Sequence, residues 1–177
     1  MKALAAALLV FVAACGQGKA IFNVDVYSFM AGSGKDTLRY VIPPAASASV
    51  STFQRILLPP GFGGSIVDSV RITSGNANLI NAGGTGTIGF ALYFAADSAG
   101  TTTATAALNI PVTAVTGAQT VPVAIAGDLS SVSTLFSKDT VWMRITATGT
   151  NAGVTPVTGK GVLTALVIRV VLQDKIL

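Results

Sequence analysis

Residue types that carry acid–base chemistry are scarce in this chain of 177 residues. It contains no histidine and no glutamate, so all seven of its acidic residues are aspartate. Histidine is the side chain whose unperturbed pKa lies nearest neutral pH, and glutamate is the next most useful acid or base. A catalytic site would have to rely on Asp, Lys, Ser and Tyr alone. We therefore expect a protein that is not an enzyme.

The glycine-rich segment 31–37 is the stretch that most invites a phosphate-binding or nucleophilic interpretation. It holds a Gly-Lys pair, but Phe29 stands where a P-loop requires glycine, and Asp36 stands where it requires Ser or Thr. Its Gly-Ser-Gly lacks the spacers of the Gly-x-Ser-x-Gly nucleophile elbow. The segment therefore predicts a loop or hairpin with an exposed lysine.

Metal ligands are also sparse. Calcium takes about six to eight oxygen ligands, and the loop residues that could supply them follow no recognised calcium spacing. Imidazole, the commonest ligand of transition metals, is absent. We expect no metal and no cofactor. The oxygen-bearing loop residues considered are Asn76, Asn78, Asn81, Asp97, Asp128 and Asp139.

Aromatic residues at the polar positions of predicted strands are the candidates for a binding surface. By parity, Trp142 and Arg144 share a face opposite the apolar one, and Tyr93, Tyr27 and Tyr40 also point away from the core. Surface aromatics stack on sugar rings or anchor protein partners. We predict Trp142, Arg144, Tyr93 and Tyr27 as interaction residues, with the pair Trp142 and Arg144 as the first choice.

The elements that position these residues follow from a period of two in the apolar pattern. The strongest apolar face consists of Ile88, Phe90, Leu92 and Phe94. Proline pairs at 43–44 and 59–60 mark strand ends, and Pro111 and Pro122 indicate edge strands. Strands are predicted at 22–27, 38–42, 49–58, 66–73, 88–95, 108–113, 119–125, 141–148 and 162–172, with a short helix at 130–136.

Between these strands, 75–78 is predicted as a turn, 81–86 as a loop and 149–160 as a long connection. The segment 162–172 is apolar on both faces except at Thr164 and Arg169, which predicts a central strand. About nine or ten short strands with turn signals between them are typical of an all-β fold. We predict a single β-sandwich, either Ig-like or jelly-roll-like, with one short helix.

The N-terminus has the features of an export signal. A lysine at position 2 precedes the apolar segment 3–12, and Val12-Ala13-Ala14-Cys15 follows. This sequence resembles the lipobox of bacterial lipoproteins, and Cys15 is the only cysteine of the chain. The resemblance implies a signal peptide over 1–14, an acylated Cys15 and a lipidated tether over 15–20. The β-sandwich domain predicted from the strand pattern then spans 21–177. The alternative is an ordinary signal peptide or an uncleaved anchor with an incidental cysteine.

The resemblance also implies a location in the cell envelope, held on the membrane by the lipid. Gly16 follows the cysteine, and by the practice of that family this favours the outer membrane, facing the periplasm. The basic residues are scattered, so nucleic-acid binding is not expected. We expect a structural or protein-interaction module, such as an accessory subunit of a membrane complex with an envelope protein as its partner. The alternative is a carbohydrate- or surface-binding module.

Overall fold

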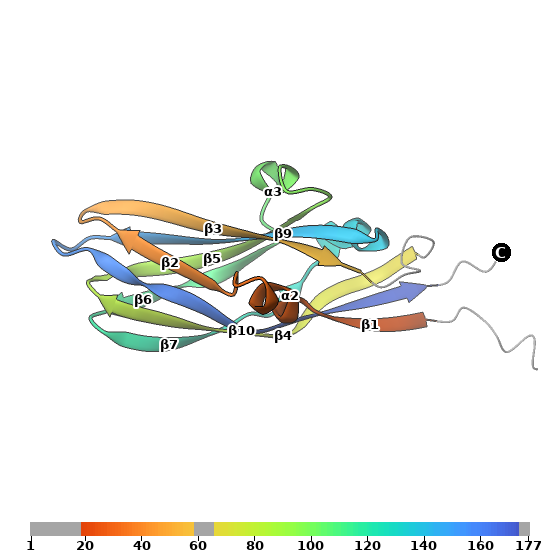
Figure 1. The fold of residues 1–177 in the computed structure, drawn as a ribbon, viewed down its shortest axis with the longest axis horizontal. Helices are drawn as coiled ribbons and strands as arrows, with labels where there is room; N and C mark the ends of the chain where they lie inside the picture. Colours follow the sequence, from red (N-terminus) through yellow and green to blue (C-terminus); the bar gives the residue numbers. More distant parts are fainter. Residues whose placement is uncertain (1–18, 59–65, 174–177) are drawn as a thin grey trace, which may run out of the picture.

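The computed structural model describes residues 19–58 and 66–173, so Cys15 and the predicted signal peptide lie outside the described residues. Two antiparallel sheets pack face to face along the length of the domain (Figure 1). This confirms the predicted all-β sandwich. The strands are β1 (Lys19–Asp25), β2 (Thr37–Ile42), β3 (Ala46–Leu57), β4 (Ile66–Gly83), β5 (Thr85–Ala95), β6 (Leu108–Thr116), β7 (Gln119–Ala124), β8 (Gly127–Asp128), β9 (Thr140–Asn151) and β10 (Val157–Gln173).

In residues 19–58 and 66–173, three short helices interrupt the strands. They are α2 (Val26–Gly32), α3 (Gly100–Thr103) and the 3-10 helix η2 (Ser130–Ser137). Only η2 was expected from the sequence. Its apolar residues Val132, Leu135 and Phe136 pack against the core, and the rings of Phe136 and Phe94 lie 5.7 Å apart, centroid to centroid.

Sheet A consists of β1, β2, β10, β4, β7 and β8, and sheet B of β3, β9, β5 and β6 in that order. Strands β1 and β2 pair with successive parts of one edge of β10, and β7 and β8 pair with successive parts of β4. If β1 with β2, and β7 with β8, are each counted as one interrupted strand, the domain has eight strands. Their order is 1-8-3-6 in sheet A and 2-7-4-5 in sheet B. This is the eight-stranded jelly-roll arrangement, so of the two predicted sandwich types the jelly roll is the one present.

The core lies between the inner faces of the two sheets. Ile88, Phe90, Leu92 and Phe94 are all buried there, as predicted. Strand β10 is central in sheet A, and the proline-containing strands β6 and β7 are the outermost strands of sheets B and A. The prolines are tolerated because an edge strand leaves part of its backbone N–H groups unpaired.

The strand predicted at 22–27 is wrong at its end, because the chain turns into a helix after Asp25. The Asp25 carboxylate accepts hydrogen bonds from the backbone N–H and the hydroxyl of Ser28, which caps α2. Val26 and Met30 lie four positions apart on the helix, and both are fully buried. Tyr27 consequently lies on α2, packed against the core, and not on the exposed face of a strand.

The loop predicted at 81–86 is limited to the reversal at Gly84 between β4 and β5, and the turn predicted at 75–78 is wrong, because β4 runs without interruption from Ile66 to Gly83. Both of its edges are paired, with β10 on one side and β7 and β8 on the other. A Cβ at Gly75 would collide with the carbonyl oxygen of Ile125. The glycine therefore permits a close strand approach, and tertiary pairing overrides the turn propensity of the nearby asparagines.

The predicted connection at 149–160 is mostly strand, since β9 extends to Asn151 and β10 begins at Val157. The short connections β2–β3, β4–β5, β6–β7 and β9–β10 gather at one end of the domain, on the left of Figure 1. Two buried asparagines connect them. The Asn81 amide donates to the carbonyls of Gly83 and Gly117, at 3.1 and 2.6 Å. The Asn151 amide donates to the carbonyls of Pro43 and Thr155, at 3.1 and 2.8 Å.

Tyr40, which parity placed on an exposed face, is buried at 6% relative exposure. The strand β2 begins at Thr37, and this puts Leu38, Tyr40 and Ile42 on its inner side. The Tyr40 hydroxyl donates to Asn81 Oδ1 at 3.2 Å. Desolvation by this burial raises the pKa of Tyr40 from 10.0 to about 12.

The raised pKa of Tyr40 predicts a loss of stability in alkali. Folding favours the neutral phenol, so the stabilisation is complete below pH 10 and is lost as the pH rises towards 12. Over that interval the free energy of unfolding should fall by about 2–3 kcal/mol more in the native chain than in Tyr40→Phe. Urea denaturation of both proteins from pH 8 upward measures the difference. Parallel curves for the two proteins would refute the assignment.

Candidate binding surface

The outer face of sheet B brings together three of the four predicted interaction residues. Trp142 and Arg144 lie on β9, and Tyr93 lies on β5 directly opposite Arg144. All three are partly exposed, while the residues between them, such as Met143, point into the core. Tyr27 is not part of this face, because it lies on α2, which contacts β10 and β3.

Arg144 is held by contacts within the chain. Its guanidinium carbon lies 3.7 Å from the centre of the Tyr93 ring, a cation–π geometry. Its Nε donates to the carbonyl oxygen of Thr101 at 2.9 Å, and its Nη1 donates to the hydroxyl of Thr146 at 2.8 Å. Arg144 therefore ties α3 to the sheet and lies over the Tyr93 ring.

A hollow of about 260 Å³ lies beside Tyr93 on this face. The hollow forms at Gly89 and Ala91 of β5, which have little or no side chain and lie between residues with larger side chains. Val112 on the edge strand β6 is 66% exposed and forms one side of the hollow. The lining is a mixture of apolar surface with hydroxyl and amide groups, contributed by Gly89, Ala91, Tyr93, Asn109, Val112 and Thr148.

Hydroxyl pairs extend across the rest of the face. Ser49 pairs with Thr148 at 3.0 Å between their hydroxyl oxygens, and Ser51 pairs with Thr146 at 2.9 Å. These bonds cross from β3 to β9 between directly opposite residues. They fix the side-chain rotamers of a flat, uncharged area next to the hollow. A preorganised polar surface of this kind loses little entropy when a ligand binds.

Several residues of this surface were missed by the sequence analysis. Phe53 and Arg55 on β3 lie directly opposite Arg144 and Trp142. Asn109 on β6 lies opposite Ala91. The alternation of 49–58 was visible in the sequence, but the register that places Phe53 beside Arg144 depends on a pairing between segments about ninety residues apart. No local signal specifies it.

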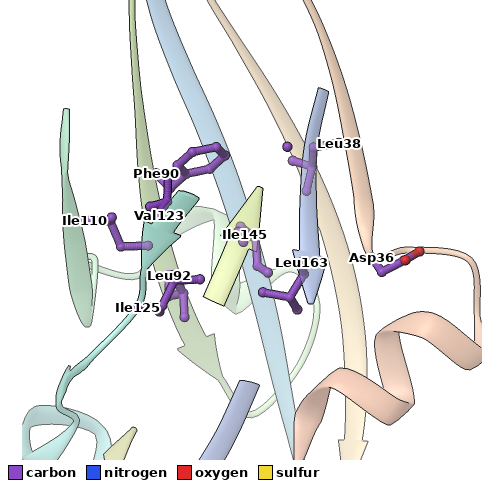
Figure 2. A pocket seen from close by; sticks show the side chains of 11 residues that line it. Asp36, Leu38, Phe90, Leu92, Ile110, Val123, Ile125, Ile145 and Leu163 are labelled. Carbon is purple, nitrogen blue, oxygen red and sulfur yellow. The ribbon is translucent and has the colours of Figure 1, made fainter. Parts of the chain in front are cut away.

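The interior holds a second, much smaller cavity, shown in Figure 2, of about 20 Å³. Leu38 and Leu163 of sheet A and Phe90, Leu92 and Ile145 of sheet B point towards it, and Asp36 lies to one side. The volume is that of about one water molecule, and such apolar cavities remain dry. This cavity is a packing gap between the sheets and not a ligand site.

The glycine-rich segment at 31–37 ends α2. The N–H of Gly34 donates to the carbonyl of Ala31 at 3.0 Å, and the N–H of Lys35 donates to that of Met30 at 2.8 Å. Gly34 has a positive φ of 68°, which completes a Schellman motif. The glycine is needed for this helix end. Within residues 19–58 and 66–173, no cluster of three His, Cys, Asp or Glu side chains forms a metal site.

No family model matches the chain, and no curated protein matches it. Solved structures resemble it in fold. The structure of the infectious bursal disease virus Gx strain aligns with 90% of this chain over 37% of the viral chain, at 7% identity and a TM-score of 0.42. The PirA structure aligns with 78% of this chain and covers 93% of the PirA chain, at 11% identity and a TM-score of 0.31. The structure of TmCBM61 in complex with beta-1,4-galactotriose aligns with 87% of this chain over 88% of the TmCBM61 chain, at 12% identity and a TM-score of 0.31.

The chain thus spans little more than a third of the viral protein that it resembles. At these TM-scores and identities the resemblances carry no argument about this chain. In the part of the chain that the structure describes, no helix has the length and apolar character needed to cross a membrane.

Proposed function

We propose that this chain is a non-catalytic carbohydrate-binding module, held at the bacterial envelope by a lipid on Cys15, and that it binds its ligand in the hollow beside Tyr93. The observation that carries the proposal is the combination of a fixed aromatic ring with a ring-sized depression of about 260 Å³. The anchor rests on the lipobox resemblance. Incorporation of labelled palmitate into the chain, and its loss in Cys15→Ser, tests it.

The chemistry of the hollow suits a sugar. Sugars present apolar C–H faces, which pack on aromatic rings, and hydroxyl groups, which exchange hydrogen bonds with amides and hydroxyls. Tyr93 supplies the ring, while Asn109 and Thr148 supply polar groups on the opposite sides of the floor. The lining contains no charged side chain. A neutral glycan fits this hollow better than an anionic ligand.

A second candidate is a protein partner in the envelope, as for an accessory subunit of a membrane complex. It is favoured by the apolar end of the same face, where Trp142 and Phe53 are partly exposed and Leu57 is 52% exposed. Buried tryptophan and arginine side chains often dominate the binding energy of protein interfaces. Trp142→Ala should then weaken association with that protein.

Glycan binding should depend on the hollow itself. Tyr93→Ala should reduce affinity for the glycan about tenfold or more, since truncation of an anchoring aromatic costs more than 1 kcal/mol. Gly89→Val should abolish binding by filling the floor, where an added Cβ already lies 3.3 Å from Val112 Cγ2. A glycan array followed by calorimetry on the full chain measures both.

Trp142→Ala is the matched control for this experiment, because it removes a larger aromatic from the same face outside the hollow. It should leave glycan affinity unchanged. If no glycan binds, or if Gly89→Val binds as well as the native chain, the carbohydrate proposal fails. Loss of a co-purifying envelope protein in Trp142→Ala alone would establish the second candidate.

A further inference from the structure

The outer face of sheet A, on the opposite side of the domain from the hollow, is rich in basic residues. The strand register places five basic side chains on it, and these are Lys19, Arg39, Arg71, Lys160 and Arg169. Lys19 is paired with Asp68 at 2.8 Å. Among the described residues, no acidic side chain lies within 4.0 Å of the charged nitrogens of the other four.

Two pairs of these cations lie directly opposite each other. Arg39 faces Lys160 across β2 and β10, and Arg71 faces Arg169 across β4 and β10. Like charges at directly opposite positions of a sheet are destabilising. Arg39 and Lys160 have no acidic residue directly opposite them, whereas Arg71 also lies opposite Asp128 of β8. An anionic partner lying on the face would relieve the repulsion that remains within these pairs.

Three acidic side chains also lie on this face, and each accepts a hydrogen bond from within the chain. Asp25 caps α2 through Ser28, and the Asp128 carboxylate accepts a hydrogen bond from the backbone N–H of Ser130 at 2.8 Å. Asp68 is occupied by Lys19. Among the described residues, the five cations of this face still outnumber these three carboxylates, and Arg39, Lys160 and Arg169 have no acidic residue directly opposite them.

Aliphatic side chains lie among these cations. On β10, the outer positions between and beside Lys160 and Arg169 include Val162, Val167 and Val171, all partly exposed. Three of the most exposed large aliphatics of the described chain lie on the neighbouring strands of the same face: Val41 at 65%, Ile21 at 62% and Ile66 at 49%. None of the described residues at outer positions of sheet A is aromatic.

We infer that the outer face of sheet A docks on an anionic lipid bilayer. Cations attract the headgroups, and aliphatic side chains insert among them, which is the combination that binds proteins to anionic membrane surfaces. A second copy of this face would be repelled by its equal charge. A single-stranded nucleic acid would be expected to require aromatic side chains for base stacking, and the face has none.

The dimensions of the face suit a flat surface. Lys160 and Arg169 are separated by nine residues of β10, or about 30 Å at the rise of a strand. The two cation pairs therefore contact the surface at widely spaced points and prevent the domain from tilting. If Cys15 carries a lipid as proposed above, it lies four residues before Lys19, within about 14 Å of chain reach. The docking inference itself does not depend on that anchor or on glycan binding.

Site-specific fluorescence tests the inference. In the full chain carrying Cys15→Ser, an introduced cysteine is the only thiol. Thr164→Cys places a label at an exposed position of β10, in sheet A, and Ser49→Cys places a matched label on the exposed face of sheet B. Each protein is mixed with vesicles of phosphatidylcholine alone, or with about a quarter of phosphatidylglycerol added, that contain a quenching lipid.

The label at Thr164→Cys should be quenched in the anionic vesicles and much less in the neutral ones, and salt should reverse the effect. The label at Ser49→Cys should remain unquenched. Arg71→Gln with Arg169→Gln should weaken partitioning about tenfold or more, while Arg55→Gln with Lys138→Gln, an equal change of charge away from this face, should not.

Equal quenching of the two labels, or equal binding to neutral and anionic vesicles, would overturn the inference. So would duplex DNA binding that the Arg71→Gln and Arg169→Gln pair abolishes without any binding to vesicles, since the face would then belong to a nucleic acid. Loss of glycan binding in Gly89→Val with unchanged vesicle binding separates this inference from the proposed function.

Discussion

Asn151→Ala is expected to lower the free energy of unfolding by about 3 kcal/mol. The Asn151 side chain is 3% exposed. Its Nδ2 donates to the carbonyls of Ile42, Pro43 and Thr155, and its Oδ1 accepts from the N–H of Gly153 at 2.8 Å. Each net hydrogen bond contributes about 1 kcal/mol, and buried groups that lose their partner cost more.

The β2–β3 and β9–β10 connections should therefore loosen together. Hydrogen exchange would detect this as faster exchange at Gly153 and Ala45, since the N–H of Ala45 is bonded to the carbonyl of Gly153 at 3.3 Å. Asn151→Asp should be at least as damaging, because a carboxylate cannot donate to the three carbonyls.

Urea denaturation measures these changes, with Asn76→Ala as the control. Asn76 is an exposed asparagine of β4, and its replacement should change stability by no more than about 0.5 kcal/mol. An Asn151→Ala protein as stable as the Asn76→Ala protein would show that the end of the domain does not depend on this side chain. Asn81→Ala, which removes the equivalent bonds to the other two connections, should resemble Asn151→Ala.

Gly159→Ala is expected to be nearly as damaging, by about 3 kcal/mol, for a steric reason. Gly159 lies between Tyr40 and Asn81 in the sheet register, and the Tyr40 ring crosses it to reach the Asn81 side chain. A Cβ at this position would collide with the Tyr40 hydroxyl and with the carbonyl oxygen of Ile80, and would lie 2.7 Å from Tyr40 Cζ. The backbone cannot retreat because β10 is paired on both sides.

Gly83→Ala is the matched control for Gly159→Ala. It adds the same methyl group to the end of β4, where no atom lies within 4 Å, and should be nearly neutral. Combining Gly159→Ala with Tyr40→Phe should recover part of the loss, because it removes one of the two colliding oxygens. If thermal denaturation shows both alanine variants unfolding at the native temperature, the proposed crossing of Tyr40 over Gly159 is incorrect.

The elements that could be predicted are those with a strong local pattern. The alternation of Ile88, Phe90, Leu92 and Phe94 predicts β5, and all four are buried. The segment 162–172, apolar except at Thr164 and Arg169, predicts a central strand, and β10 is indeed paired along both edges. The prolines at 111 and 122 predict edges because they cannot donate to a ladder.

Other elements were predicted wrongly because tertiary contacts overrode local propensity. Gly75, Asn76 and Asn78 have the composition of a turn, yet they lie inside β4 between two pairing partners. The helix α2 was not predicted, because seven residues are too few to show a repeating helical pattern of apolar side chains. Asp25 followed by Ser28 is nevertheless a helix-capping signal.

The candidate site shows the same division. The parity of β9 places Trp142 and Arg144 together without any knowledge of the fold. That Arg144 contacts Tyr93 depends on the register of β5 against β9, which joins segments about fifty residues apart. Tyr27 was assigned to the surface by the same parity argument, and the helix cap at Asp25 made that argument inapplicable.

The sequence by itself determined the all-β class, because the period of its apolar residues is a local property of the chain. It also determined the scarcity of acid–base side chains, since the absence of histidine and glutamate is a matter of composition. The tertiary structure alone decided the jelly-roll order, the hollow beside Tyr93 and the opposed cations of sheet A. These arise from strand register, and register is fixed by the packing of distant segments around one core.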